Sequence, residues 1–201
     1  MVKAIRIHKP GGPDAMVFED VQVKPPGPGE AYIRQTAVGV NFIDIYFRSG
    51  AYPLPSLPHG LGTEGAGVVE AVGSGVTEVS VGDRVAYAGP PGGYASERLI
   101  PADRVVKLPS SIDYKTAAAM MLQGMTVRYL LRKTYQVGPG TTLLWHAAAG
   151  GVGLIACQWA KHLGATVIGT VGSDEKAALA KANGCDHPIV YSREDFVAEV
   201  K

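Results

Sequence analysis

The stretch that decides the fold of this 201-residue chain is TTLLWHAAAGGVGLIAC, residues 141–157. An apolar strand pattern runs directly into small residues, which open an apolar helix pattern. The run Ala148-Ala149-Gly150-Gly151-Val152-Gly153 matches the dinucleotide fingerprint G-x-G-x-x-G, with alanine in the first place. Small residues there let the chain turn tightly, approach a pyrophosphate closely and pack the helix on the strand. The stretch therefore predicts a strand–turn–helix unit that binds a dinucleotide.

Strand and helix patterns alternate after this turn. TVIGTV (166–171) and HPIVY (187–191) have the composition of strands, and SDEKAALAKANG (173–184) that of a helix. The order βαβαβ predicts a Rossmann-type, doubly wound parallel sheet in an α/β fold. Only about three strands of such a sheet precede Lys201, so we expect its first half alone, with weak cofactor binding by these 201 residues by themselves.

The first half of the chain has a different pattern. Short alternating runs such as VKAIRIH (2–8) and AYIRQTAV (31–38) are separated by Gly and Pro clusters, which predicts a mostly β, partly closed barrel. The run YKTAAAMMLQGMTVRYLLRK (114–133) predicts a helix that bridges two domains. We place the domains at residues 1–123 and 124–201.

Charge and composition exclude several classes of function. The chain has 19 basic and 18 acidic residues, spread without a basic block, so no nucleic acid or membrane partner is expected. The N-terminus has a strand pattern and not that of a signal peptide, which indicates a cytoplasmic protein. Cys157 and Cys185 are too few and too far apart for a disulfide framework or a metal-binding pair.

The end of the second expected strand indicates which dinucleotide is bound. NAD enzymes carry an acidic residue there, whereas this chain reads Thr170-Val171-Gly172-Ser173. Lys176 follows in the first turn of the next helix, and Tyr191 and Arg193 follow the third strand. A cation and small polar groups suit a 2′-phosphate and favour NADP(H), although Lys176 as a merely solvated helix residue is the alternative.

Over its whole length the chain resembles the medium-chain dehydrogenase/reductase superfamily. The resemblance rests on three segments, 39–44 (GVNFID), 62–69 (GTEGAGVV) and 81–85 (VGDRV), and on AAAGGVG, which resembles the zinc-free, zeta-crystallin-like quinone oxidoreductases. It implies a GroES-like β domain before the Rossmann-type domain, NADPH-dependent reduction of a quinone or enone, and a homodimer. Where zinc-dependent relatives hold their metal, this chain has Asn41, Thr63 and Gln123, so no metal site is expected.

The resemblance also implies the site residues. The candidates for catalysis are Asn41, Asp44, Tyr46 and Tyr52. The candidates for cofactor binding are Phe42, Ile43, Asp44, Tyr46, Thr126, Ala149, Gly150, Gly151, Val152, Gly172, Ser173, Lys176 and Tyr191. A quinone oxygen that gains negative charge needs only a neutral donor, such as Asn41, Tyr52 or water.

Other residues and functions stay open at this point. Glu64 is expected to be a satisfied buried carboxylate, and His59 and His146 to be structural, with His146 lining the cofactor cleft. Two other functions remain: a nucleotide-binding structural or RNA-binding protein without turnover, and an enoyl-thioester reductase.

Overall fold

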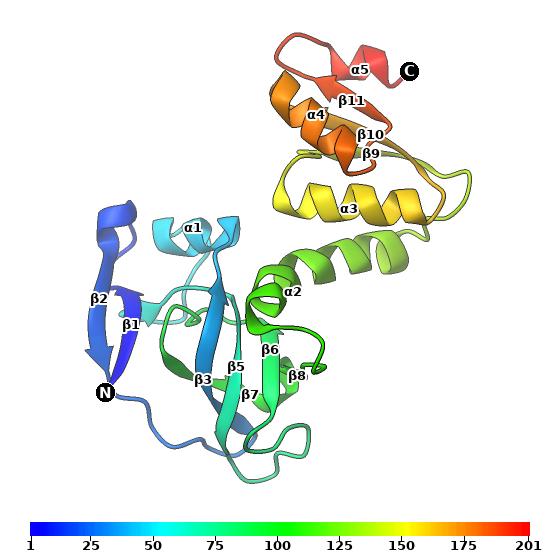
Figure 1. Cartoon of the computed structure of the whole chain (residues 1–201). Helices are drawn as coiled ribbons and strands as arrows, with labels where there is room; N and C mark the ends of the chain where they lie inside the picture. The colour runs from blue at the N-terminus through cyan, green and yellow to red at the C-terminus, as the bar shows by residue number, and fades with distance from the viewer. The chain divides into compact units, whose positions relative to one another are not determined.

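The computed structural model describes all residues, 1–201, and divides them into two units, Met1–Leu122 and Gln123–Lys201 (Figure 1). The boundary expected from the sequence lies between residues 123 and 124. No helix has both the length and the apolar character needed to cross a membrane. The units are described separately below.

The first unit contains two antiparallel sheets. The smaller has the order β2-β1-β4 and consists of β1 (Val2–Ile7), β2 (Met16–Val21) and β4 (His59–Gly60). The larger has the order β7-β3-β5-β6-β8 and consists of β3 (Glu30–Gly39), β5 (Glu64–Val72), β6 (Arg84–Ala88), β7 (Glu97–Pro101) and β8 (Val106–Lys107). One bridge, Ala4 with Ala95, joins the smaller sheet to the segment before β7. The predicted mostly β domain is thereby confirmed.

Alternation along the strands builds the core of this unit. Ala31 and Ile33 on β3 are fully buried, as are Val85 and Tyr87 on β6, because residues two apart face the same side of a sheet. Two one-turn 3₁₀ helices, Pro13–Ala15 and Ala102–Arg104, connect strands. The core supports β5, whose first residue is Glu64.

Helix α1 (Phe42–Ser49) follows β3, within the half of the chain for which the sequence predicts mostly β structure. Asn41 precedes it in extended conformation, and the Asp44 carboxylate accepts a hydrogen bond from the Asn41 backbone N–H at 2.9 Å. This is the acidic half of a capping box. The helix ends at Gly50, whose φ of 83° favours glycine. The helix is short and lies close to Gly and Pro clusters, so the periodicity of its apolar residues is too brief to indicate a helix.

Helix α2 (Tyr114–Tyr129) begins in the first unit and continues into the second, ending in a π-helical turn at Leu130–Thr134. The Asp113 side chain caps its start, because its two oxygens accept from Thr116 N at 2.9 Å and from Thr116 Oγ1 at 2.7 Å. The predicted bridging helix is present at almost the predicted length.

The second unit is a three-stranded parallel sheet with helices packed on it (Figure 1). Its strands are β9 (Thr142–His146), β10 (Thr166–Val171) and β11 (His187–Val190), in the order β11-β10-β9. Its remaining helices are α3 (Gly151–His162), α4 (Asp174–Ala182) and α5 (Phe196–Glu199). Strand order 3-2-1 with crossover helices is the first half of a doubly wound sheet, which confirms the predicted α/β fold class.

Candidate functional site

The fingerprint turn lies between β9 and α3. Ala147 leaves the strand with a φ of 53°, and Gly150 in extended conformation precedes the first residue of α3. A Cβ on Gly153 would collide with the carbonyl oxygens of Ala147 and Ala148, so only glycine allows α3 to pack this closely on the strand end. Gly150 and Gly151 are exposed, which leaves backbone N–H groups of the helix N-terminus open to an anionic ligand. Ala149 and Val152 flank these glycines and are half-buried.

A pocket of about 670 Å³ lies at the carboxyl ends of the three parallel strands. His146, Thr170 and Tyr191 contribute to it from the ends of β9, β10 and β11, and Phe196 of α5 lines it as well. His146 Nδ1 lies 3.0 Å from Thr170 Oγ1, and its ring meets Phe196 edge-on at 5.4 Å. Ligands of open parallel sheets bind at this end of the strands.

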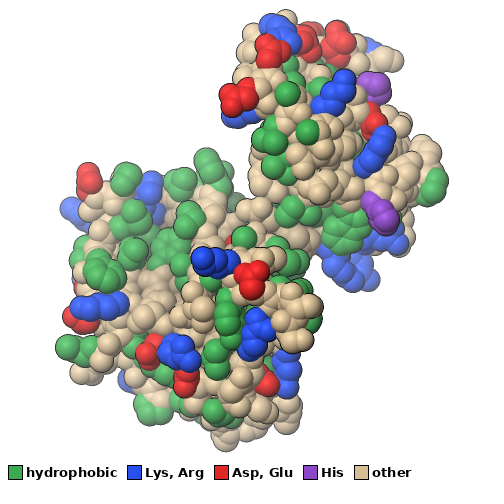
Figure 2. Space-filling model, viewed as in Figure 1, with side chains coloured by type: hydrophobic (Ala, Val, Ile, Leu, Met, Phe, Trp, Pro, Cys, Tyr) green, Lys and Arg blue, Asp and Glu red, His purple; other side chains and the backbone are tan.

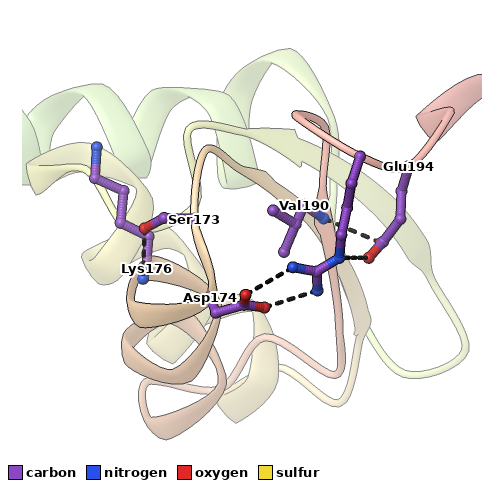
Figure 3. Close-up of polar contacts among 6 residues, drawn as sticks. Ser173, Asp174, Lys176, Val190 and Glu194 are labelled. Carbon is purple, nitrogen blue, oxygen red and sulfur yellow. Dashed lines mark hydrogen bonds and ion pairs between the residues drawn. The ribbon is translucent and has the colours of Figure 1, made fainter.

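Polar side chains after β10 and β11 form a second group in this unit (Figure 3). Ser173 Oγ accepts from the backbone N–H of Lys176 at 3.3 Å and caps α4. Arg193 binds both oxygens of Asp174 at 2.7 Å, and this contact lowers the pKa of the Asp174 carboxyl. Arg193 Nε also contacts Glu194 Oε1 at 3.0 Å. Arg193 is therefore occupied by two carboxylates.

Lys176 is the cation of this group that has no carboxylate partner. It forms no ion pair, and in Figure 3 its side chain extends away from Asp174. Nearby, a Cβ on Gly172 would lie 2.9 Å from the Tyr191 hydroxyl, so the absence of a side chain at Gly172 makes room for that tyrosine. Tyr191 is 57% exposed. The structure thus brings Gly172 and Tyr191 together at the strand ends, with Ser173 and Lys176 in the adjoining turn.

In the first unit, Asp44 is the centre of a buried polar network. Its side chain is on α1, and the residue is only 5% exposed. The carboxylate accepts from Asn41 N at 2.9 Å, Thr63 Oγ1 at 3.1 Å and Tyr94 OH at 2.7 Å. Burial and the Asp44 carboxylate both raise the pKa of Tyr94, so that hydroxyl stays a donor. The network ties the start of α1 to the segment before β5 and to the segment before β7.

Glu64 extends this network and contacts Asn41 directly. It is 1% exposed, and its Oε2 accepts from Asn41 Nδ2 at 2.6 Å while its Oε1 accepts from Leu122 N at 2.8 Å. Burial raises the pKa of Glu64, and these two hydrogen bonds oppose the rise. The sequence indicates that Glu64 is a satisfied buried carboxylate but does not identify its partners. It gives no sign of Tyr94, because nothing local links that residue to Asp44, 50 positions earlier.

Aromatic side chains on and just after α1 form a group that contains the candidate residues Phe42, Tyr46 and Tyr52. Tyr46 lies 5.7 Å from Phe42 and 5.2 Å from Tyr52 between ring centroids, and Tyr52 also meets Phe47 at 5.8 Å. Tyr46 is 38% and Tyr52 46% exposed, whereas Ile43 is half-buried. The predicted catalytic residues therefore separate into a buried pair, Asn41 and Asp44, and an exposed pair, Tyr46 and Tyr52.

An apolar pocket of about 930 Å³ lies beside α1 in the same unit. Figure 2 shows hydrophobic side chains gathered on this face, over β1, β2 and α1. Its apolar lining includes Ile5, Phe18, Val38, Val40 and Ile45, and the predicted site residues Asn41, Phe42 and Asp44 also border it. Tyr46 and Tyr52 do not line this pocket.

Three residues of this chain correspond to the place where, by the resemblance, zinc-dependent relatives hold their metal: Asn41, Thr63 and Gln123. One N–H of the Asn41 side-chain amide donates to Glu64, and the Thr63 hydroxyl donates to Asp44. Gln123 belongs to the second unit, where its amide packs against Gly151. An amide nitrogen and a neutral hydroxyl are poor zinc ligands, and the chain contains no group of three or more His, Cys, Asp or Glu side chains arranged to hold a metal. Thr126, a predicted cofactor contact, lies one turn after Gln123 on α2.

Comparisons with known proteins agree with this architecture. Residues 27–110 match the alcohol dehydrogenase GroES-like domain, and residues 151–201 match the zinc-binding dehydrogenase family. A quinone oxidoreductase of Pseudomonas aeruginosa is 54% identical over 201 residues, and a 2-haloacrylate reductase of Burkholderia sp is 51% identical over 208. The chain is covered completely in both matches and spans 62% of the length of each relative.

Solved structures give the same result. The quinone oxidoreductase of Pseudomonas syringae superposes with a TM-score of 0.97 at 55% identity, covering 100% of this chain and 62% of that one. The Escherichia coli quinone oxidoreductase in complex with NADPH superposes with a TM-score of 0.96 at 51% identity, covering 99% and 61%. The chain therefore belongs to the medium-chain dehydrogenase/reductase superfamily, in the group that contains the quinone oxidoreductases.

Proposed function

We propose that this protein reduces quinones or related conjugated carbonyls with NADPH and without a metal ion. The observation that carries the proposal is the turn between β9 and α3. Its exposed Gly150 and Gly151 offer backbone N–H groups to a pyrophosphate, and Gly153 has no room for a Cβ. The remaining proposed cofactor contacts are Phe42, Ile43, Asp44, Tyr46, Thr126, Ala149, Val152, Gly172, Ser173, Lys176 and Tyr191.

The preference for NADPH over NADH rests on the turn after β10. Asp174 is the first carboxylate after this strand, and Arg193 holds both of its oxygens, which removes it as a partner for a ribose hydroxyl. The Lys176 ammonium has no carboxylate partner and is exposed, so it is available to a 2′-phosphate together with the Ser173 and Tyr191 hydroxyls. The E. coli relative solved with NADPH supports the same cofactor.

Bound NADPH supplies the hydride for the reduction. The acceptor oxygen gains negative charge as the hydride arrives, and neutral donors on and after α1 stabilise it: the amide of Asn41 and the hydroxyls of Tyr46 and Tyr52. Asp44 does not need to act as an acid. It holds the start of α1 through the Asn41 backbone and thereby places the Asn41 side chain.

Zinc independence is supported by the hydrogen-bond directions at Asn41 and Thr63. Both groups donate to buried carboxylates, Glu64 and Asp44, and turning either of them toward a metal would break those bonds. A metal analysis of the purified protein checks this point. Stoichiometric zinc that leaves together with activity on chelation would contradict it.

The relatives support a substrate class that includes both quinones and other conjugated carbonyls. A quinone oxidoreductase and a 2-haloacrylate reductase have similar identity to this chain, 54% and 51%, and both names describe a conjugated, electron-poor acceptor. A homodimer is part of the proposal and is checked by the mass of the protein in solution.

The deciding experiment measures NADPH oxidation by the full-length protein. The acceptors are a benzoquinone, a 2-haloacrylate, a simple enone, an enoyl thioester and a saturated aldehyde, each also tested with NADH. We expect turnover with the quinone or a conjugated carbonyl and none with the aldehyde. Preference for the thioester would identify an enoyl-thioester reductase, whereas cofactor binding without turnover would favour a non-catalytic nucleotide-binding protein.

A further inference from the structure

We propose that Glu64 is a positioning residue, which fixes the direction in which the Asn41 amide faces a substrate. The inference rests on the proposed function, in which Asn41 is a neutral donor to the acceptor oxygen. Asn41 immediately precedes α1, and Glu64 is the first residue of β5. Both lie in the first unit, and the two side chains meet inside it.

The contact is buried, and Glu64 forms no ion pair. Glu64 is 1% and Asn41 7% exposed, and the ion pairs of the protein do not include Glu64. The carboxylate depends instead on two N–H donors, Asn41 Nδ2 at 2.6 Å and Leu122 N at 2.8 Å. A buried carboxylate is costly unless such donors satisfy it, so the pair is held together by strong, charge-assisted hydrogen bonds.

The surrounding backbone confines the Glu64 side chain. A Cβ on Gly39 would collide with Glu64 Oε2 and with the carbonyl oxygen of Ala118. The carboxylate thus fills the space that a side chain on β3 would need, and it lies where β3 and α2 come close together. Because Leu122 N holds its other oxygen, the side chain cannot swing toward another partner.

A carboxylate accepts hydrogen bonds and donates none, so the amide nitrogen of Asn41 must face Glu64. One N–H of the planar NH₂ group is then held by Glu64, and the direction of the second N–H, which is the one left to donate to a substrate oxygen, is fixed with it. An asparagine without such a partner can flip its amide and exchange donor for acceptor at the same place. Glu64 removes this ambiguity, which matters at a site where a donor has to meet an oxygen that gains negative charge.

Glu64→Gln tests the inference, with Glu70→Gln as the matched control. In Glu64→Gln the oxygen of the new side chain still accepts from Leu122 N, but its NH₂ group now opposes the Asn41 NH₂ and turns that amide over. The flip exchanges the Asn41 NH₂ group with its carbonyl oxygen and so removes the second N–H from the place where it donates to the substrate. We expect kcat to fall about tenfold, with less than a twofold change in the Kd for NADPH. Glu70 lies on the same strand, with its carboxylate exposed and paired with Arg34 at 2.6 Å, so its variant should keep wild-type kcat.

A second variant separates positioning from folding. Asn41→Asp combined with Glu64→Gln restores the contact with the donor reversed, because the introduced amide can donate to the new carboxylate. We expect its Tm to return toward the wild-type value while kcat stays low, since a carboxylate cannot donate to the acceptor oxygen. Wild-type kcat in Glu64→Gln alone would overturn the inference, as would recovery of both Tm and kcat in the double variant.

A measurement without turnover keeps this test distinct from the proposed function. The Asn41 side-chain NH₂ signals in an NMR spectrum of labelled protein, assigned by their loss in Asn41→Asp, should shift in Glu64→Gln and stay unchanged in Glu70→Gln. Unchanged signals in Glu64→Gln would overturn the inference even in an active enzyme. A wild-type protein that oxidises NADPH with none of the acceptors would instead refute the proposed function.

Discussion

Removing the Asp44 carboxylate should destabilise the first unit more than any exposed acidic substitution. Asp44 is 5% exposed and satisfies three donors: Asn41 N, Thr63 Oγ1 and Tyr94 OH. Asp44→Ala leaves all three without their acceptor, at about 1 kcal/mol each, so we expect the free energy of unfolding to fall by about 3 kcal/mol. The start of α1 should also loosen, because Asp44 caps it.

Asp44→Asn separates the hydrogen bonds from the charge. The oxygen of the new amide can replace Oδ2, which accepts from Asn41 N and Tyr94 OH, and its nitrogen can donate to a Thr63 hydroxyl that rotates to accept. We therefore expect this variant to lose less than about 1 kcal/mol. Asp14→Ala, on an exposed acid in a 3₁₀ turn, serves as the control and should stay within about 0.5 kcal/mol of the wild type.

Urea unfolding followed by circular dichroism measures the global effect, and hydrogen exchange of peptides that cover residues 41–49 measures the local one. Exchange in that segment should rise in Asp44→Ala and not in Asp14→Ala. The reasoning is refuted if Asp44→Ala loses less than about 1 kcal/mol, or if Asp44→Asn is as unstable as Asp44→Ala.

Three further predictions concern the nucleotide unit and pH. Lys176→Ala should weaken NADPH binding about 10- to 100-fold and leave NADH binding unchanged in a fluorescence titration; equal losses for both would contradict the phosphate contact. Gly153→Ala should lower affinity for both cofactors at least about tenfold, because its Cβ meets backbone that cannot move away; wild-type affinity would argue against the close turn. Burial raises the pKa of Glu64 in the folded state, so its contribution to stability is complete at low pH and is lost as pH rises through that raised pKa. The stability of wild type relative to Glu64→Gln should therefore fall with rising pH, and a constant difference in urea titrations would count against the shift.

Local patterns in the sequence determine the architecture of this protein. The alternation of strand and helix after residue 141 predicts the parallel sheet, and the small residues at 148–153 predict the turn that opens α3. These predictions succeed because they depend on periodicity and on backbone space, which neighbouring residues set. The residue types at Asn41 and Thr63 by themselves also disfavour a zinc site.

Tertiary structure alone decides which polar groups meet. Asp44 reaches Tyr94 and Glu64 reaches Asn41 and Leu122 across separations of 23 to 58 residues, which no local pattern encodes. The same holds for Arg193. The sequence places this basic residue after the third strand, near the expected phosphate site, but only the structure shows that it binds Asp174. The physical reason is that a buried carboxylate is stable only with donors gathered around it, and folding brings those donors from distant segments of the chain.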